Sequence, residues 1–240
     1  MFLVLPIGDE PNDHVRKPVV TWLLIAANVA AFVWMLSQGG SSAAGQERLL
    51  REWGYVPSEA RLSTLLTHMF THAGWMHLIG NMLFLWIFGD NVESRLGHLG
   101  FLALYLLTGV VALHAHLWLG SGEADMPLVG ASGAVSGVQG LYFVACPGAR
   151  VRLFFWMLYV VRVSLVPARG LMVVWFIIND VLPVLVAGPR DHVAHWAHLG
   201  GFATGLALMA ILVPFLGRNE PPPRRSVAER YPHRLRHGGR

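Results

Sequence analysis

Four polar side chains lie in strongly apolar stretches of this chain, and their types suit acyl-transfer chemistry. Ser132 stands among glycines in "LVGASGAVSGVQG", His198 lies in "AHLGGFATG", and His77 and Asn81 are four residues apart in a third stretch. A serine hydroxyl is a poor nucleophile until a base removes its proton, and histidine has a pKa suited to that work. Polar groups inside a membrane are energetically unfavourable, and those that occur there commonly have a function, so these four residues are candidate site residues.

The composition is that of a membrane protein. Of the 240 residues, 54% are hydrophobic and 13% are charged, whereas soluble domains carry about 25% charged residues. Cys146 is the single cysteine, so no internal disulfide is expected. No cleavable signal sequence is evident at the start, because acidic residues follow the first apolar ones. Most of the excess positive charge lies in 217–240, which we interpret as a disordered tail contacting anionic lipid rather than nucleic acid.

Hydropathy predicts an all-α polytopic membrane protein with six transmembrane helices, since each span needs roughly 20 apolar residues. The expected spans are 18–36, 75–89, 98–120, a fourth between Pro127 and Pro147, a fifth over about 169–187, and 193–217. We divide the chain into a cytoplasmic segment (1–17), a membrane domain (18–216) and the tail (217–240). Segment 151–168 is interpreted as a loop along the membrane surface, with a seventh span left open.

Positive residues indicate the orientation. Cytoplasmic loops are enriched in lysine and arginine, and six spans place the basic positions on one side, with both termini cytoplasmic. These positions are Arg16, Lys17, Arg95, Arg150, Arg152 and the tail. Alanine- and arginine-rich usage favours a bacterial inner membrane.

The fourth span is unusually short. Its helix can begin only near Ser132, because Pro127 and the glycines before it disfavour helix, and it must end by Cys146, because a residue preceding proline avoids the helical region. About 15 residues give a length of about 22 Å, less than the hydrocarbon thickness of about 30 Å. Ser132 is therefore expected at a helix N-terminus below the membrane surface. The backbone before it must be buried in protein or line a wet cavity.

Glycine pairs predict how the serine and histidine meet. Gly133 and Gly137 lie one turn apart on the fourth span, as do Gly201 and Gly205 on the sixth, and such small-residue pairs let helices approach closely in lipid. If the pairs face each other, Ser132 comes within hydrogen-bond reach of a histidine base. A tetrahedral oxyanion would then be held by the Ser132 backbone N–H and by two donors on the second span, His77 and Asn81.

Three motifs, "HAGWMHLIGN", "GASG" and "AHLGGFATG", resemble those of the rhomboid intramembrane serine proteases, in the same order and on alternate helices. The resemblance implies a six-helix bundle over 18–216 that cleaves single-span membrane proteins without a metal or other cofactor. It implies a dyad of Ser132 and His198 with no third acid, and an oxyanion site at His77 and Asn81. Close-packing glycines are expected at Gly130, Gly133, Gly137, Gly201 and Gly205.

The resemblance also implies lateral substrate entry past the second and fifth spans, with Trp175 and Phe176 as gate residues. Ser136 departs from the family pattern, because many relatives carry an aromatic residue there that packs on the base. The first loop, with "LLREWGY", matches its family motif only loosely. Expected partners are transmembrane substrates and membrane lipids, with no nucleic acid; the sequence does not indicate an oligomeric state.

Other polar residues receive structural interpretations. His68 and His72 are expected to hold the start of the second span, and Asn179 and Asp180 to make packing contacts within the fifth. A supporting role for His195 stays open.

Three other functions remain to be distinguished. A metal or haem site built from His68, His72, His77 and His198 would leave Ser132 without a role, and "HMFTH" lacks the glutamate of a zinc protease. The absorption spectrum and the metal content of the purified protein distinguish this possibility, because a haem absorption band or stoichiometric zinc would favour it over a serine protease. A catalytically inactive rhomboid relative would typically lack the serine or the histidine, and both are present. A transporter would commonly show an internal repeat, and none is apparent.

Overall fold

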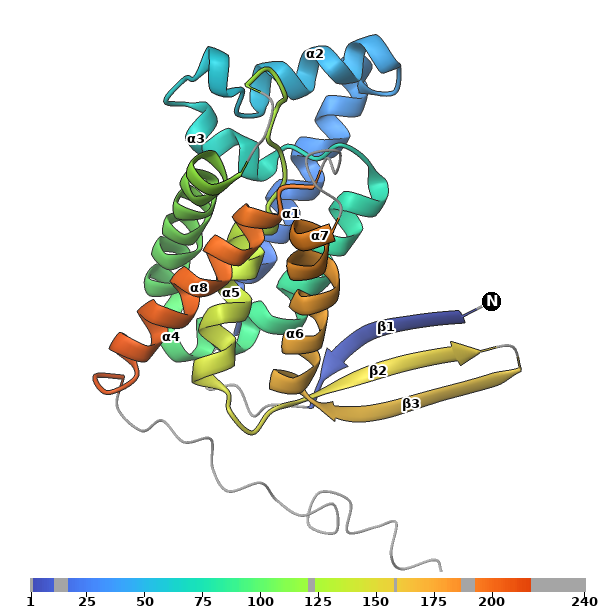
Figure 1. Cartoon of the computed structure of the whole chain (residues 1–240), viewed down its shortest axis with the longest axis vertical. Helices are drawn as coiled ribbons and strands as arrows, with labels where there is room; N and C mark the ends of the chain where they lie inside the picture. The colour runs from blue at the N-terminus through green and yellow to red at the C-terminus, as the bar shows by residue number, and fades with distance from the viewer. Residues whose placement is uncertain (1, 11–16, 121–123, 158, 187–192, 217–240) are drawn as a thin grey trace, which may run out of the picture.

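The computed structural model describes residues 2–10, 17–120, 124–157, 159–186 and 193–216. The chain is mostly helical, as predicted (Figure 1). The α-helices are α1 (Val19–Met35), α2 (Ala43–Trp53), α3 (Thr64–Thr67), α4 (Trp75–Leu119), α5 (Ser132–Ala145), α6 (Ala168–Phe176), α7 (Leu182–Val186) and α8 (His195–Leu212). Shorter helical turns are η1 (Leu36–Gly40), η2 (Pro57–Glu59), η3 (His68–Phe70) and η4 (Ile177–Val181), and the strands are β1 (Phe2–Asp9), β2 (Arg150–Met157) and β3 (Val160–Pro167).

Four helical stretches of the described residues have the length and hydropathy needed to cross a membrane. They are Val19–Gly40, Trp75–Leu119, Ala168–Val186 and His195–Leu212. The second of these is 45 residues long and is interrupted at Gly97, where φ is 74°. Glycine adopts this left-handed conformation readily, so Gly97 divides α4 into two limbs that run in different directions (Figure 1).

The all-α prediction is wrong in one region, because the described chain contains a three-stranded antiparallel sheet in the order β1-β2-β3. Segment 151–168 forms most of β2 and β3, which corrects both the surface loop and the possible seventh span. In β2, Val151 and Leu153 are buried while Arg150 and Arg152 are exposed. This alternation has the two-residue period of a strand. Figure 1 shows the sheet extending sideways from the helices near the start of α6.

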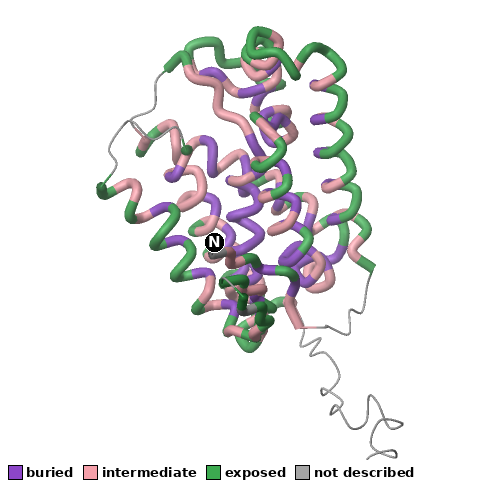
Figure 2. The backbone as a smooth tube through the Cα atoms, turned by 90° about the vertical axis from the view of Figure 1, so that its right-hand side faces the viewer, coloured by how far each residue is buried: buried purple, intermediate pink, exposed green. Residues whose placement is uncertain are grey.

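Helix α5 is the buried centre of the molecule. It begins at Ser132 and ends at Ala145 with Cys146 as its C-cap, which confirms the bounds predicted for the fourth span. Eleven of its 14 residues are buried, so α5 is surrounded by protein rather than by lipid. Figure 2 shows the buried parts of the chain gathered in the middle of the bundle and the exposed parts on its outer sides.

Glycines allow α5 and α8 to pack in direct backbone contact. A Cβ on Gly201 would collide with the carbonyl oxygen of Gly133, and a Cβ on Gly205 would collide with the carbonyl oxygen of Gly137. Gly201 and Gly205 therefore lie directly against the backbone of Gly133 and Gly137, but the nearest atom to a Cβ at Gly133 is Cβ of Ala112 on α4, so the two pairs do not face each other symmetrically as the sequence predicts. On its other side, Gly137 lies against Thr108 of α4. Close packing of this kind stabilises helix association in lipid, where water does not drive helices together.

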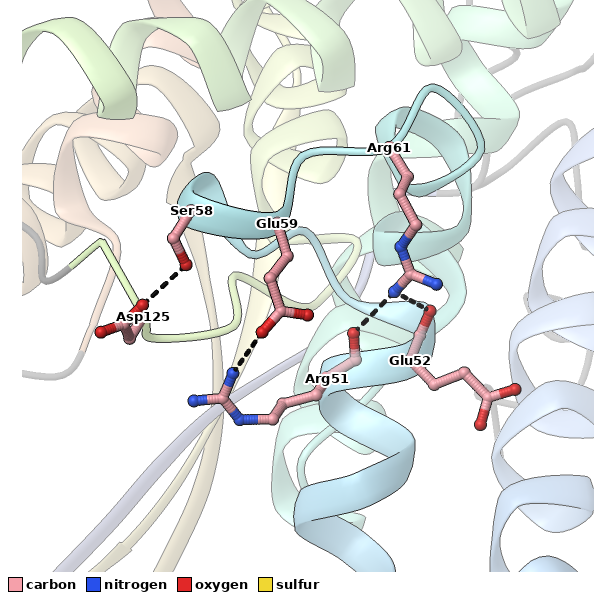
Figure 3. A network of polar contacts seen from close by, with 6 residues as sticks. All are labelled: Arg51, Glu52, Ser58, Glu59, Arg61 and Asp125. Carbon is pink, nitrogen blue, oxygen red and sulfur yellow. Dashed lines mark hydrogen bonds and ion pairs between the residues drawn. The ribbon is translucent and has the colours of Figure 1, made fainter.

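The irregular segment before Ser132 is held by the long loop between α1 and α4. Tyr55 and Leu128 exchange two backbone hydrogen bonds of 2.9 and 2.8 Å, and the Gly130 N–H donates to the carbonyl oxygen of His68 at 2.9 Å. Figure 3 shows the Ser58 hydroxyl donating to the Asp125 carboxylate, at 2.7 Å. The backbone leading to Ser132 is thus paired with protein, as its expected depth in the membrane requires. The first loop, unassigned from sequence, supports this segment.

Arginines hold the end of α2 against the turn that follows it (Figure 3). Arg61 donates to the carbonyl oxygens of Arg51 and Glu52 at 2.9 and 2.7 Å, and Arg51 pairs with Glu59 at 3.1 Å. Exposed ion pairs contribute about 0–1 kcal/mol, so these contacts chiefly set the path of the loop.

Glu93 fastens α1 to the break in α4. Its fully buried carboxylate accepts hydrogen bonds from the backbone N–H groups of Val20 (2.8 Å) and Thr21 (2.7 Å) and from the Thr21 hydroxyl (2.7 Å), and it contacts His98 at 2.5 Å. The first N–H groups of a helix lack partners within it and favour a negative charge nearby. Glu93 therefore caps α1 from a distant part of the chain.

We expect Glu93→Ala to lower the free energy of unfolding by about 3 kcal/mol, because it leaves several buried donors unpaired. The midpoint of thermal unfolding in detergent should fall by about 6–12 °C. Thr21→Val, which removes only the hydroxyl bond, is the control and should cost about 1 kcal/mol. An unchanged midpoint for Glu93→Ala would contradict the capping role.

Candidate active site

All four residues singled out for chemistry line one cavity of ≈ 430 Å³ between α4, α5, η4 and α8. Ser132 is the first residue of α5, and His198 lies in the first turn of α8. His77 and Asn81 lie near the start of α4. Three segments that are far apart in the sequence thus contribute polar side chains to the lining of one cavity.

Ser132 lies where its backbone N–H and hydroxyl can both face a ligand. The preceding residue, Ala131, is the N-cap of α5 and makes no side-chain cap hydrogen bond. The first N–H groups of a helix have no partner within the helix and carry a partial positive charge. Ser132 therefore combines a hydroxyl with an anion-attracting helix terminus.

Gly130 and His77 fit together before Ser132. Gly130 has φ of 112°, a conformation that side-chain-bearing residues rarely adopt, and a Cβ there would lie 2.5 Å from Nε2 of His77. Asn81 donates one amide N–H to the backbone carbonyl of His77 at 3.0 Å. Its amide has a second N–H, and the Asn81 Nδ2 lies 3.7 Å from the Cβ position of Gly130. Both side chains therefore approach the backbone beside the serine.

We expect Gly130→Ala to slow fluorophosphonate labelling of Ser132 about 100-fold, the effect of losing one oxyanion donor. The new methyl group would displace the His77 imidazole and would strain the backbone. The rate of labelling in detergent measures the effect. Gly148→Ala is the matched control, since a Cβ at Gly148 meets nothing within 4 Å. Equal rates for both variants would contradict this role of Gly130.

His198 has a carboxylate partner that the sequence interpretation did not provide. Its Nδ1 lies 2.6 Å from Oδ1 of Asp180, and the same oxygen lies 3.2 Å from Nδ1 of His195. The expectation for Asp180 was a packing contact within the fifth span; the structure instead joins it to the imidazole on α8. The signal that could have found it is the acid itself, since carboxylates inside spanning helices are rare and usually functional.

Ser132 and His198 share the cavity without a direct bond: within the described part of the chain, no hydrogen bond joins them. The sequence prediction was that they would come within hydrogen-bond reach. Ligand-free active sites often hold nucleophile and base slightly apart, because the bond tightens when substrate is bound.

His68 and His72 lie beside the cavity, in the loop before α4. Nδ1–H of His68 donates to the carbonyl oxygen of Thr64 at 2.9 Å, and the ring of His72 packs edge-on against that of His77, with centroids 5.2 Å apart. These contacts agree with the structural roles expected for both. Among the residues that the structure describes, the trio of ligand-type side chains close enough to share a metal ion is Asp180, His195 and His198. The histidine set considered for a metal site from sequence does not form such a group.

Burial of His68 makes stability depend on pH. Burial lowers the pKa of His68 from 6.5 to about 4, and burial together with the nearby His77 lowers that of His72 to about 4. Between about pH 4 and pH 6.5, each of these two histidines is protonated in the unfolded chain and neutral in the folded chain. Stability is therefore complete above pH 6.5 and declines as the pH falls toward 4.

We expect the thermal unfolding midpoint in detergent to fall between pH 7.5 and pH 4.5, with each histidine contributing up to about 3 kcal/mol. His68→Gln keeps a donor for Thr64 but does not titrate, so its midpoint should depend less steeply on pH. Identical pH profiles for wild type and His68→Gln would show that His68 does not cause the decline.

Comparisons with known proteins point to one family. The Rhomboid domain model matches residues 59–215. "Rhomboid protein 1, mitochondrial" of Saccharomyces cerevisiae is 32% identical over 139 residues, which are 56% of this chain and 39% of that protein. "RHOMBOID-like protein 2" of Arabidopsis thaliana is 31% identical over 176 residues, 73% of this chain and 50% of the relative. "Presenilin-associated rhomboid-like protein, mitochondrial" of Mus musculus is 24% identical over 238 residues, which are 90% of this chain and 58% of that protein.

The chain therefore matches from about two fifths to somewhat over half of the length of these three relatives. The domain match and the apolar helices together identify a polytopic membrane protein that belongs to the rhomboid family.

Proposed function

We propose that this protein is an intramembrane serine endopeptidase in which Ser132 is the nucleophile and His198 the base. The observation that carries the proposal is the convergence of Ser132, His198, His77 and Asn81 on one cavity of ≈ 430 Å³. A nucleophile, a base and two hydrogen-bond donors are the groups that amide hydrolysis needs. No other function considered from the sequence uses all four.

In the proposed reaction, Nε2 of His198 takes the hydroxyl proton of Ser132 as Oγ attacks the substrate carbonyl carbon. The oxyanion that forms is held by the Ser132 N–H and by His77 and Asn81, each donor being worth about 3 kcal/mol in the barrier. The C–N bond then breaks, and His198 returns the proton to the leaving amine. Water attacks the resulting ester by the same sequence of proton transfers, which releases the new carboxylate and restores Ser132.

We propose that substrates are single-span membrane proteins that enter laterally between α4 and α6. Phe84 of α4 and Trp175 of α6 pack across the cavity with ring centroids 5.2 Å apart, and both line it, as does Phe176. Trp175 is 37% exposed. An aromatic contact of this kind can open by rotation of one side chain, and it supports Trp175 and Phe176 as gate residues.

The proposed membrane domain, 18–216, is a six-helix bundle. Its crossings are α1, the two limbs of α4, α5, the run from α6 to α7, and α8. Orientation by positive charge puts Arg95, Arg150 and Arg152 on the cytoplasmic side together with both termini. Arg16 and the tail, 217–240, lie outside the described residues. The bacterial inner membrane stays a prediction, because the relatives named above are from yeast, plant and mouse.

Cleavage of tagged single-span proteins tests the proposal. The full-length protein, reconstituted in lipid vesicles, should cut a panel of such substrates within or next to the transmembrane helix, and sequencing of the new N-termini locates the cut. Ser132→Ala should abolish cleavage. Cleavage that survives in Ser132→Ala, or wild-type protein that binds substrates and leaves every one intact, would contradict the proposed function.

A further inference from the structure

We propose that Asp180 is a positioning residue for the base, so that the site works as a Ser132–His198–Asp180 triad. This inference rests on the proposed function and adds a residue to it. The carboxylate accepts the Nδ1–H of His198, which fixes the imidazole in the tautomer whose Nε2 lone pair is free for the Ser132 proton. It also stabilises the imidazolium that forms when that proton is transferred.

The contact between Asp180 and His198 has the length of a strong hydrogen bond. The two atoms are 2.6 Å apart, slightly less than the roughly 2.7–2.9 Å of charge-assisted N–H···O bonds. The Asp180 side chain is 3% exposed and that of His198 is 19% exposed. In such an environment water competes weakly for the bond, which holds the imidazole ring in one orientation.

The backbone around Asp180 is arranged to turn this one acid inward. Asp180 lies in η4, a single turn of π-helix that joins α6 to α7, and it is the one buried residue of the five in that turn. Its neighbours Ile177, Ile178 and Asn179 are exposed. Single π-helical turns occur frequently at functional sites. A turn that served only to pack helices would bury an isoleucine and expose the aspartate.

Two other interpretations of the same cluster are weaker. A metal ion held by Asp180, His195 and His198 would separate its ligand atoms by roughly 3.3 Å in tetrahedral geometry, whereas Asp180 and His198 contact each other directly at the 2.6 Å spacing of a hydrogen bond. A purely structural contact would be expected to favour the more buried partner. The shorter bond instead goes to His198, which lines the cavity, and the 3.2 Å bond goes to the more buried His195.

The test compares kcat and KM of Asp180→Asn with those of wild type, using the full-length protein in vesicles and one single-span substrate. Asparagine keeps the shape, but its amide can favour the wrong imidazole tautomer, so kcat should fall by about 10²–10⁴-fold. KM should change by less than about threefold, because asparagine keeps the shape of the cavity lining and Asp180 acts through His198. Asn179→Ala is the matched control: it alters the neighbouring exposed residue, whose amide donates to the Trp175 carbonyl at 2.9 Å, and should leave kcat unchanged.

Asp180→Ala with added formate gives a second measurement. Because Asp180 lines the open cavity, formate can enter and occupy the place of the lost carboxylate. Activity should be lost in this variant and regained in part as formate is added, while formate should leave wild type unaffected. His195→Leu removes the 3.2 Å bond and keeps the 2.6 Å one. A lower midpoint of thermal unfolding in this variant, with kcat retained, would agree with positioning by Asp180.

The outcomes separate this inference from the proposed function. Wild-type protein that cleaves, with Asp180→Asn retaining kcat within about threefold of it, would overturn the role of Asp180 and leave the Ser132–His198 pair standing. Stoichiometric zinc in the purified protein, lost in Asp180→Asn, would also overturn it in favour of a metal site. If wild type neither cleaves nor labels with a fluorophosphonate, the proposed function fails and this inference fails with it.

Discussion

Ser132→Ala is expected to lower the cleavage rate by about 10⁴-fold or more, and His198→Ala to lower it about equally. The reason is that the two side chains act as one unit: without the base the hydroxyl remains protonated, and without the hydroxyl the base has no proton to take. The double variant should therefore be no slower than either single variant. Initial rates with one single-span substrate in vesicles measure all three.

Ser136→Ala is the matched control for this first prediction. Ser136 is a buried serine one turn further along α5, and it lines the same cavity. Its replacement removes a hydroxyl from the same wall without touching the proposed nucleophile, and the rate should stay within about threefold of wild type. If the double variant is slower than either single variant by the product of their separate rate losses, the two side chains act independently. That result would contradict proton transfer from Ser132 to His198.

Gly205→Val is expected to be the most damaging substitution away from the cavity. A Cβ at Gly205 would collide with the carbonyl oxygen of Gly137 and lie 3.0 Å from the backbone N of Leu141. Both atoms belong to the backbone of α5, so no side-chain rotation can make room. Overpacking of this kind costs about 3 kcal/mol, which corresponds to a midpoint of thermal unfolding about 6–12 °C lower.

Separating α5 from α8 should also remove activity, because Ser132 and His198 stand on those two helices. Gly170→Ala is the control, since a Cβ at Gly170 meets nothing within 4 Å. It should leave both the unfolding midpoint and the cleavage rate near those of wild type. A stable and active Gly205→Val would show that backbone contact between the two helices is not required.

Local signals in the sequence are enough to predict α5. Pro127 and Pro147 exclude helix on either side, and the short interval between them determines where Ser132 lies along the helix axis. The glycine spacing likewise predicts close backbone contact between α5 and α8, although the Cβ positions of Gly133 and Gly137 themselves point at Ala112 and Thr108 of α4. Both predictions depend on residues close together in the chain.

The sheet could not be predicted in the same way. The segment "VRLFFWMLYVVRVSLVPA" is apolar enough to suggest a membrane surface, and its two-residue alternation is partly hidden by consecutive aromatic and aliphatic residues. Its partner β1 lies about 150 residues earlier in the chain, where Leu3 pairs with Trp156. Pairing over such a distance leaves no local signal in either segment.

Asp180 was missed for a related reason. Its four-residue spacing from the buried residues Met172 and Phe176 places it on the inner side of the helix, but the sequence does not show which side chain of another helix it meets there. The resemblance to rhomboid proteases also implied a base without a third acid. The structure supplies a carboxylate at 2.6 Å from that base, which only the three-dimensional arrangement of η4 and α8 reveals.

The most direct test of the central claim is to locate the adduct of a fluorophosphonate probe by mass spectrometry of the full-length protein. Ser132 activated within the cavity predicts a single stoichiometric adduct on the peptide that contains Ser132, absent from Ser132→Ala and greatly slowed in His198→Ala. An adduct on any other residue, or equal labelling of Ser132→Ala, would contradict the claim that Ser132 is the nucleophile.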